Sequence, residues 1–356
     1  MAKTGNFTEA AQRGVAASLA AALLFGASTP LAKLLLAQAS PWLLASLLYL
    51  GSGIGLWLLR RLLRKPAVRL PRGELKWLAA AVLAGGVAGP LLLMSGLAMT
   101  PASSASLLLN AEGVFTALLA WFVFRENFDR RIALGMLAIV AGGVVLAWPE
   151  SMSLSAWSGA ALIAAACLAW AIDNNLTRKV SLNDATWIAM VKGLAAGATN
   201  FVLAMVSGAS VPAWPVVAAA GLLGFASYGA SLVLFVISLR ELGTARTGAY
   251  FSVAPFFGAA LSIVLLGDAL TPQLAIAAVL MGAGVWLHLT ERHEHVHRHE
   301  PIEHSHEHVH GHGDPHHDHT HDPPVPPGTQ HSHPHRHQPI THSHPHFPDA
   351  HHRHEH

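Results

Sequence analysis

The sequence contains repeated apolar runs of about 20 residues, and no other feature constrains the fold as strongly. Between residues 15 and 290, Ala, Leu, Val, Gly, Ile, Phe and Trp dominate, and charged residues fall in a few short clusters. A helix of roughly 20 apolar residues crosses the hydrocarbon core of a bilayer. Only helices and closed barrels satisfy their backbone groups in lipid, and these runs lack the alternation of barrel strands. The sequence therefore predicts an all-α integral membrane protein.

Ten membrane-spanning helices are expected. Pro41, Pro101 and Pro272 stand near predicted helix starts, where the missing N–H of proline costs no helical hydrogen bond. The polar segment 1–14 precedes the first apolar run without a cleavage site, so we expect no removed signal peptide. The predicted spans are 15–37, 41–59, 77–99, 102–124, 131–148, 157–178, 184–207, 215–239, 245–267 and 271–290.

Lysine and arginine are distributed unequally between two sets of short loops. They are abundant in loop 60–76 and occur again at 125–131, 178–179 and 240–246. The alternate loops, near 38–41, 100–101, 149–156, 208–214 and 268–271, contain none. Because cytoplasmic loops carry the excess of Lys and Arg, both termini are expected in the cytoplasm and the protein in the inner (plasma) membrane.

The chain also resembles itself weakly. A shift of 142 residues aligns 101–148 with 243–290, and a shift of 145 residues aligns LLFGASTPLAK (23–33) with LAWAIDNNLTR (168–178). Two similar shifts indicate a duplicated five-helix unit, and an odd helix number gives the two copies opposite orientations. Such inverted repeats are typical of secondary transporters. The expected parts are a cytoplasmic N-terminus (1–14), two five-helix repeats (15–148 and 157–290) and a tail (291–356).

Four segments carry a resemblance to a known family. They are FGASTPLAK in the first run, GLAMTPASSASLLLNAEGVFTALLAWFVFREN (96–127), LAWAIDNNLTRKVS (168–181) and ELGTARTGAYFSVAPFFGAALSIVLLGDAL (241–270). Through them, residues 15–290 resemble the EamA family of the drug/metabolite transporter superfamily. The resemblance implies a ten-helix carrier, usually an exporter of small metabolites, amino acids or drugs, and it leaves the substrate open.

The family pattern has, in each half, an apolar helix with a central proline and an acidic residue just beyond the helix end. Pro255 and Asp268 fit this pattern in the second half, and Glu126 fits it in the first. At the first-half proline position this chain has Gly113, preceded by Glu112. The departure draws attention to Glu112 as a residue particular to this chain.

Polar side chains inside the apolar runs form the candidate transport site, because burying them in lipid is costly. Glu112 would bind a proton, a cation or a substrate amine; the structural alternative is a protonated carboxyl bonded to another helix. Lys33 either faces the pathway or extends its side chain to the membrane surface. Lys192 lies too deep in its span to reach the surface in the same way. Tyr250 and Phe257 are candidate pocket walls. The full set of pathway residues is Glu112, Lys33, Asn110, Asp173, Asn174, Asn175, Lys192 and Pro255.

All 25 histidines lie at or after His288, and nearly all belong to the polar tail 291–356. This tail has almost no large apolar residues, so we expect it to be disordered. Alternating His-x-His with interspersed Asp and Glu suits Zn, Ni, Co or Cu ions; the alternative is a solvated chain whose charge follows pH. The candidate ligands are His304, His306, His308, His310, His312, His316, His317, His319, His321, His342, His344 and His346.

Three functions fit these features. The first is export of a small metabolite, amino-acid-like or drug-like, by alternating access with proton exchange at Glu112 and a metal-binding tail. The second is efflux of Zn, Ni or Co ions loaded by the tail, and the third is a membrane-anchored metal sensor or buffer. Apart from His288 and Cys167 the spans lack His and Cys, which favours an organic solute.

The sequence has neither a nucleotide-binding loop nor a hydrolytic constellation, so we expect no ATP-driven pump, no enzyme and no required cofactor. The expected partners are a small-molecule substrate, membrane lipid and divalent metal ions. Nucleic acid is not expected, and a homodimer is a possible assembly.

Overall fold

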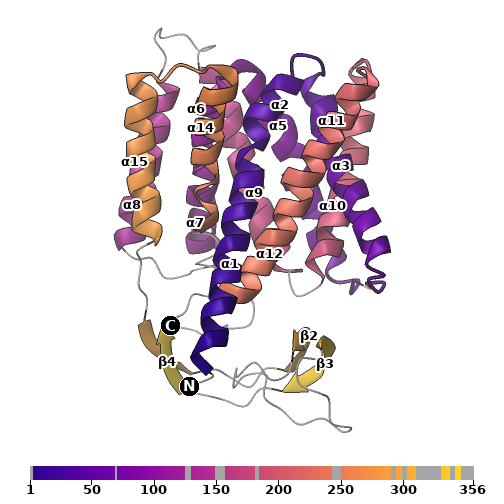
Figure 1. The fold of residues 1–356 in the computed structure, drawn as a ribbon, viewed down its shortest axis with the longest axis vertical. Coiled ribbons are helices and arrows are strands. Elements are labelled where there is room, and N and C mark those ends of the chain that lie inside the picture. The colour runs from indigo at the N-terminus through magenta and orange to yellow at the C-terminus, as the bar shows by residue number, and fades with distance from the viewer. Residues whose placement is uncertain are drawn as a thin grey trace. The chain divides into compact units, whose positions relative to one another are not determined.

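A computed structural model describes residues 3–68, 70–124, 130–148, 157–180, 184–242 and 250–289, together with four short strands in the tail. The chain divides into two compact units, Met1–Glu291 and Arg292–His356, which are described separately. In the first unit all described secondary structure is helical, and the helices run side by side as a bundle (Figure 1).

The helices of the first half follow the predicted apolar runs. They are α1 (Lys3–Gly26), α2 (Ser28–Leu35), α3 (Pro41–Leu62), α4 (Leu75–Ala81), η1 (Val82–Ala88), α5 (Gly89–Met99), α6 (Ala102–Leu108), α7 (Ala111–Phe124) and α8 (Arg130–Ala147). The segment η1 is a π-helical stretch that continues α4 into α5 without a break.

The second half has a similar series of elements. It contains α9 (Ser158–Arg178), α10 (Ala185–Val206), α11 (Trp214–Gly224), η3 (Phe225–Ala230), α12 (Ser231–Leu242), α14 (Ala254–Leu266) and α15 (Pro272–Leu289). Here too a π-helical stretch, η3, joins two α-helices into one continuous rod.

Six helical rods among the described residues are long and apolar enough to cross a membrane, and the chain is accordingly a multi-pass membrane protein. They are Gln12–Leu35, Pro41–Leu62, Leu75–Met99, Ser158–Thr177, Ala185–Val206 and Trp214–Phe235, with shorter apolar helices at Ala133–Ala147, Ala254–Leu266 and Pro272–Leu287. The predicted span 102–124 is divided by a turn at residues 109–110, and the start of the span 245–267 lies outside the described residues. Ten spans therefore remain a prediction.

The helices pack in pairs taken from opposite halves of the chain. The closest pairs are α3 with α10 and α8 with α15, which stand at opposite edges of the bundle in Figure 1. Glycine permits the first contact, because a Cβ added at Gly193 would lie 2.7 Å from the backbone nitrogen of Gly53. The halves are thus interleaved, and the candidate site lies between them.

The tail was predicted to be disordered. Its described residues form β1 (Glu294–Arg298), β2 (Glu303–Val309), β3 (Gln330–Arg336) and β4 (Thr341–Pro345). The strands pair antiparallel, β1 with β4 and β2 with β3. The other residues of 291–356 lie outside the description, so their disorder stays a prediction.

Candidate functional site

Helix α9 carries the largest group of polar side chains inside the bundle. Trp170, Asp173, Asn174 and Thr177 occupy positions i, i+3, i+4 and i+7, which places them along one side of the helix. Asp173 is only 7% exposed and Trp170 only 6%, so their polar atoms are buried in a largely apolar bundle. Such burial requires polar partners from neighbouring helices.

Lys192 of α10 is the partner of Asp173. Its Nζ donates to Asp173 Oδ1 at 2.6 Å and Oδ2 at 2.7 Å, and to Thr177 Oγ1 at 3.1 Å. The Thr177 hydroxyl in turn lies 2.8 Å from Asp173 Oδ1. The side chains of Lys192 and Asp173 are 15% and 10% exposed, so this is a nearly desolvated ion pair whose charges cancel.

Glu112 lies in the first turn of α7 and faces α9 from the other side. Its Oε1 accepts a hydrogen bond of 2.8 Å from Asn174 Nδ2. The side chain is half-buried, and a Cβ at the neighbouring Gly113 would have no atom within 4 Å. No cation is paired with Glu112 among the side chains that the structure places. Glu112 thus presents an accessible carboxylate beside a neutral ion pair.

Three of the predicted residues shape helices instead of extending this cluster. The amide of Asn110 donates to Leu107 O at 3.0 Å and holds the turn that divides α6 from α7. Asn175 donates to Ala171 O, 2.9 Å away in its own helix. Pro255 is buried in the first turn of α14, where its missing N–H costs nothing.

Lys33 lies at the opposite end of α5 from the basic loops. Its Nζ donates to the carbonyl oxygens of Leu97 at 2.5 Å, Ala98 at 3.3 Å and Thr100 at 2.9 Å. The ammonium therefore caps the carboxyl end of α5, a role that the sequence did not indicate. Asp268 lies between α14 and α15, and its Oδ2 accepts a hydrogen bond of 2.8 Å from the backbone nitrogen of Ser103 and caps the start of α6.

Four aromatic side chains from four helices form a closed circuit beside the polar cluster, which we name the aromatic box: Phe25 (α1), Tyr49 (α3), Trp170 (α9) and Tyr228 (η3). The ring centroids of Phe25 lie 6.4 Å from Trp170 and 5.8 Å from Tyr228, and those of Tyr49 and Tyr228 lie 5.4 Å apart. Tyr49 Oη and Trp170 Nε1 close the circuit, because both donate to Gly85 O at 2.9 Å.

The carbonyl of Gly85 is available because it lies in the π-helical stretch η1. Its neighbour Gly86 O accepts from Asn200 Nδ2 at 2.9 Å, so a third side chain satisfies this stretch. Gly85 also has no room for a side chain, since a Cβ there would overlap the carboxylate of Asp173. The wide turn thus fixes both the aromatic box and the ion pair.

The sequence did not indicate the members of the aromatic box as site residues. The one available signal was the shift of 145 residues, which aligns Phe25 with Trp170, and these two rings are in contact. Tyr250 and Phe257 were the aromatic residues expected to line a pocket. Phe257 does line a hollow, but one of a different kind.

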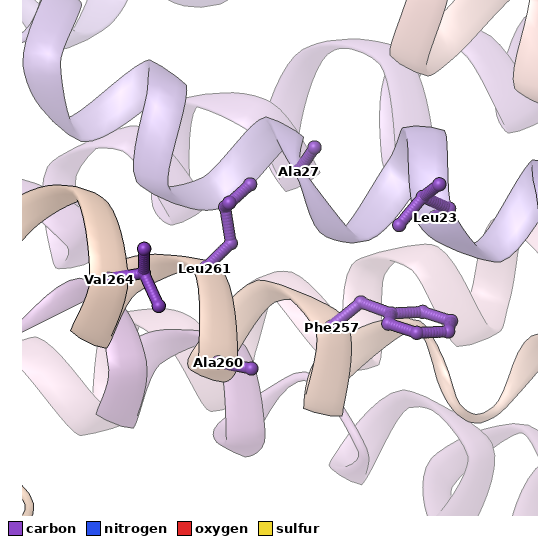
Figure 2. A pocket seen from close by; sticks show the side chains of 6 residues that line it. All are labelled: Leu23, Ala27, Phe257, Ala260, Leu261 and Val264. Atoms are coloured by element: carbon purple, nitrogen blue, oxygen red, sulfur yellow. The ribbon is translucent and has the colours of Figure 1, made fainter.

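This hollow is an apolar groove with a volume of about 260 Å³ between α1 and α14 (Figure 2). Its lining residues are Leu23, Ala27, Phe257, Ala260, Leu261 and Val264. Leu23 and Val264 are 52% and 79% exposed, so the groove opens on the outside of the bundle. With no polar side chain at its walls it offers hydrophobic contact and no chemistry.

The predicted metal ligands lie in the tail. His304, His306 and His308 are in β2 and His342 and His344 are in β4, whereas the other predicted ligands are outside the described residues: His310, His312, His316, His317, His319, His321 and His346. Among the residues that the structure describes, no three His, Cys, Asp or Glu side chains are grouped as metal ligands would be.

Comparison with known proteins identifies relatives along most of the chain. Residues 12–148 and 157–290 match the EamA-like transporter family. An uncharacterized transporter of Methanothermobacter thermautotrophicus is 29% identical over 293 residues, which cover 77% of this chain and 85% of that protein. A probable amino-acid metabolite efflux pump of Salmonella typhimurium is 27% identical over 212 residues, 53% of this chain and 68% of the pump.

A solved crystal structure whose description names no function has the same fold. It superposes with a TM-score of 0.59 and covers 79% of this chain and 98% of its own, at 21% sequence identity.

Proposed function

Because the chain belongs to the EamA-like transporter family, whose members are transporters, we propose that it exports a small organic metabolite by alternating access between two inverted five-helix repeats. The observation that carries the proposal is the accessible carboxylate of Glu112, held by Asn174 between the two halves of the bundle. An ionisable group in such a place is costly to keep, and in transporters it commonly binds the substrate or the coupling ion.

The pairing of helices supports the ten-span inverted repeat. Exchange of the two halves would carry α1 onto α9 and α12 onto α5, so the contacts α1–α12 and α9–α5 are copies of each other. The pairs α3–α10, α8–α15 and α6–α14 would each map onto themselves. The stretches η1 and η3 also occupy corresponding rods, and the contact of Phe25 with Trp170 joins two residues that the sequence shift equates.

Proton exchange at Glu112 is the proposed coupling. If this carboxylate binds either a proton or a substrate molecule, but not both, export of the substrate is coupled to movement of a proton in the opposite direction. The test is transport by the full chain in proteoliposomes with an imposed pH gradient. E112Q should lose gradient-driven transport, whereas the matched change E74Q, at the start of α4 and outside the cluster, should retain it. Full gradient-driven transport by E112Q would end the proposal.

The proposed orientation places both termini in the cytoplasm and the chain in the inner membrane, on the strength of the Lys- and Arg-rich loops. At that end of the bundle Arg60 forms an ion pair with Asp184 at 2.6 Å. The tail would then lie on the side from which an exporter takes up its substrate.

We further propose that the tail binds divalent transition metals, with metal efflux as the second candidate function. The strand register supports metal binding: His304 stands opposite His335, His306 opposite His333, and His308 opposite His331. Directly opposed residues have Cβ atoms about 5 Å apart, a spacing at which two imidazoles can share one ion. In the other strand pair His295 opposes His344 and His297 opposes His342.

The two functions are separated by comparing the full chain with a chain that ends at Glu291, in cells lacking the native gene. If only the full chain lowers cellular Zn, Ni or Co, the tail supplies an efflux pathway. Equal metal contents would make the tail a regulator or a buffer, and leave the organic solute as the substrate.

A further inference from the structure

We propose that the exported solute is an organic cation, an amine with an aromatic or apolar body, whose ammonium binds at Glu112 and whose body enters the aromatic box. This inference rests on the proposed transport function and names its substrate class. It differs from the expectation for an amino acid, in which a lysine of the pathway would pair with the carboxylate of the solute.

The charges of the cluster carry the first step. Lys192 is engaged by both oxygens of Asp173, and Lys33 is engaged by three backbone carbonyls at the end of α5. Glu112 and Asp173 against Lys192 leave the cluster with one net negative charge when both acids are ionised. Among the side chains that the structure places here, no cation is therefore free for a substrate carboxylate. A cation gains an opposite charge at Glu112, whereas the carboxylate of a zwitterion would meet like charge.

The aromatic box carries the second step. Its rings come from both halves, and two of its polar ends are turned to the protein, because Tyr49 Oη and Trp170 Nε1 both donate to Gly85 O. A ligand would therefore contact the faces and edges of the rings in the aromatic box. Aromatic faces attract ammonium groups and pack against apolar bodies, but they offer nothing to a carboxylate.

Glu112 and the aromatic box lie close enough together to bind one small molecule. Trp170 and Asn174 are one helical turn apart on α9, about 6 Å along the axis, and Asn174 holds Glu112. Phe25, Tyr49, Tyr228 and Glu112 are each half-buried, so each keeps some accessible surface.

The test uses three probes with the same ring and a similar chain: 2-phenylethylamine, phenylalanine and 3-phenylpropionate, which are a cation, a zwitterion and an anion. Transport of each is measured with the full chain in proteoliposomes. We expect kcat/KM for the amine to exceed that for phenylalanine by at least about tenfold, and no transport of the anion. Because E112Q should also lose gradient-driven transport, its preference is measured as binding of each probe to the purified full chain, where the preference for the amine should be lost.

A gain of function provides the sharper test. D173N frees Lys192, which can then pair with a substrate carboxylate, so phenylalanine should gain about tenfold relative to the amine. The double variant D173N/K192M removes both charges of the pair and keeps the net charge of the cluster; it should work more slowly but keep the preference for the amine. Y228L should weaken the affinity for the amine several-fold.

The outcomes separate this inference from the proposed function. Equal or better transport of phenylalanine by the unaltered chain would overturn the cation inference and leave an exporter of small organic solutes. Transport of Zn or Ni ions with none of the three probes moved would overturn both. Loss of the amine preference in D173N/K192M would overturn the charge argument, provided that the variant remains monodisperse in detergent.

Discussion

The buried pair of Asp173 and Lys192 allows a specific prediction about stability. Removing one charge of a desolvated pair leaves the other without compensation, which typically costs about 3–5 kcal/mol. The two single variants should not cost the same. After K192M, the carboxylate of Asp173 keeps only the Thr177 hydroxyl as a donor. After D173N, the ammonium keeps Thr177 Oγ1 and can use the new amide oxygen as a second acceptor.

We therefore expect K192M to lower the free energy of unfolding by about 3–5 kcal/mol and D173N by about 1–3 kcal/mol. The double variant D173N/K192M should lose less than K192M alone, because no uncompensated charge is left in the bundle. The coupling free energy between the two sites should then be at least about 2 kcal/mol, well above the value for an exposed pair.

The measurement is a double-mutant cycle for unfolding in mixed detergent micelles, followed by circular dichroism. T199A is a suitable control on the same helix, since Thr199 is exposed and its hydroxyl bonds only to Ala195 O in its own helix. It should change the free energy of unfolding by no more than about 0.5 kcal/mol. Additive effects of the two single variants would show that the pair is solvated, and the charge argument at the site would then fail.

Three further predictions concern the framework of the bundle. Partial burial alone would raise the pKa of Asp184, but hydrogen bonds from Arg60 and from the backbone lower that pKa below its ordinary value of 3.8. The pair should therefore stabilise the fold above about pH 4 and lose this contribution at lower pH, and D184N should erase the difference between unfolding midpoints at pH 6 and pH 3. G193L should prevent stable folding, seen as aggregation in size-exclusion chromatography, because even a Cβ would lie 2.7 Å from Gly53 N. K33M should speed amide hydrogen exchange at residues 97–100 about tenfold, and unchanged exchange there would argue against the cap.

The sequence predicted the architecture more completely than the site. Runs of apolar residues report directly on burial in lipid, so the helical rods and their loops could be located from composition alone. The interruptions could not be located. The turn at residues 109–110 and the π-helical stretch η1 depend on contacts with other helices, such as those of Asn110 and Asn200, and leave little trace in local periodicity.

Within the candidate site, the polar residues could be found in the sequence from their type, but their bonding partners could not be predicted. Glu112, Asp173, Asn174 and Lys192 were identified because ionisable and amide side chains are rare in apolar runs. Lys192 neutralises Asp173 and so changes the charge offered to a solute. This pairing depends on the placement of α9 and α10, both of which contact η1. Single aromatic residues in an apolar chain carry no such signal, since most of them only fill space, and the aromatic box was missed for that reason.

The two π-helical stretches bear on the history of the chain. A π turn accommodates one residue more than an α turn, so a single-residue insertion in an existing α-helix can be accommodated as a π turn. η1 begins at Val82 and η3 at Phe225, an offset of 143 residues that falls within the range of the internal alignments. If the proposed duplication gave rise to the two halves, one insertion that preceded it explains both stretches more simply than two independent events at matching places. The wide turn would then be older than the asymmetry between the halves, and the acidic and aromatic groups that now surround Gly85 would have been added to an ancestral five-helix unit that already carried it.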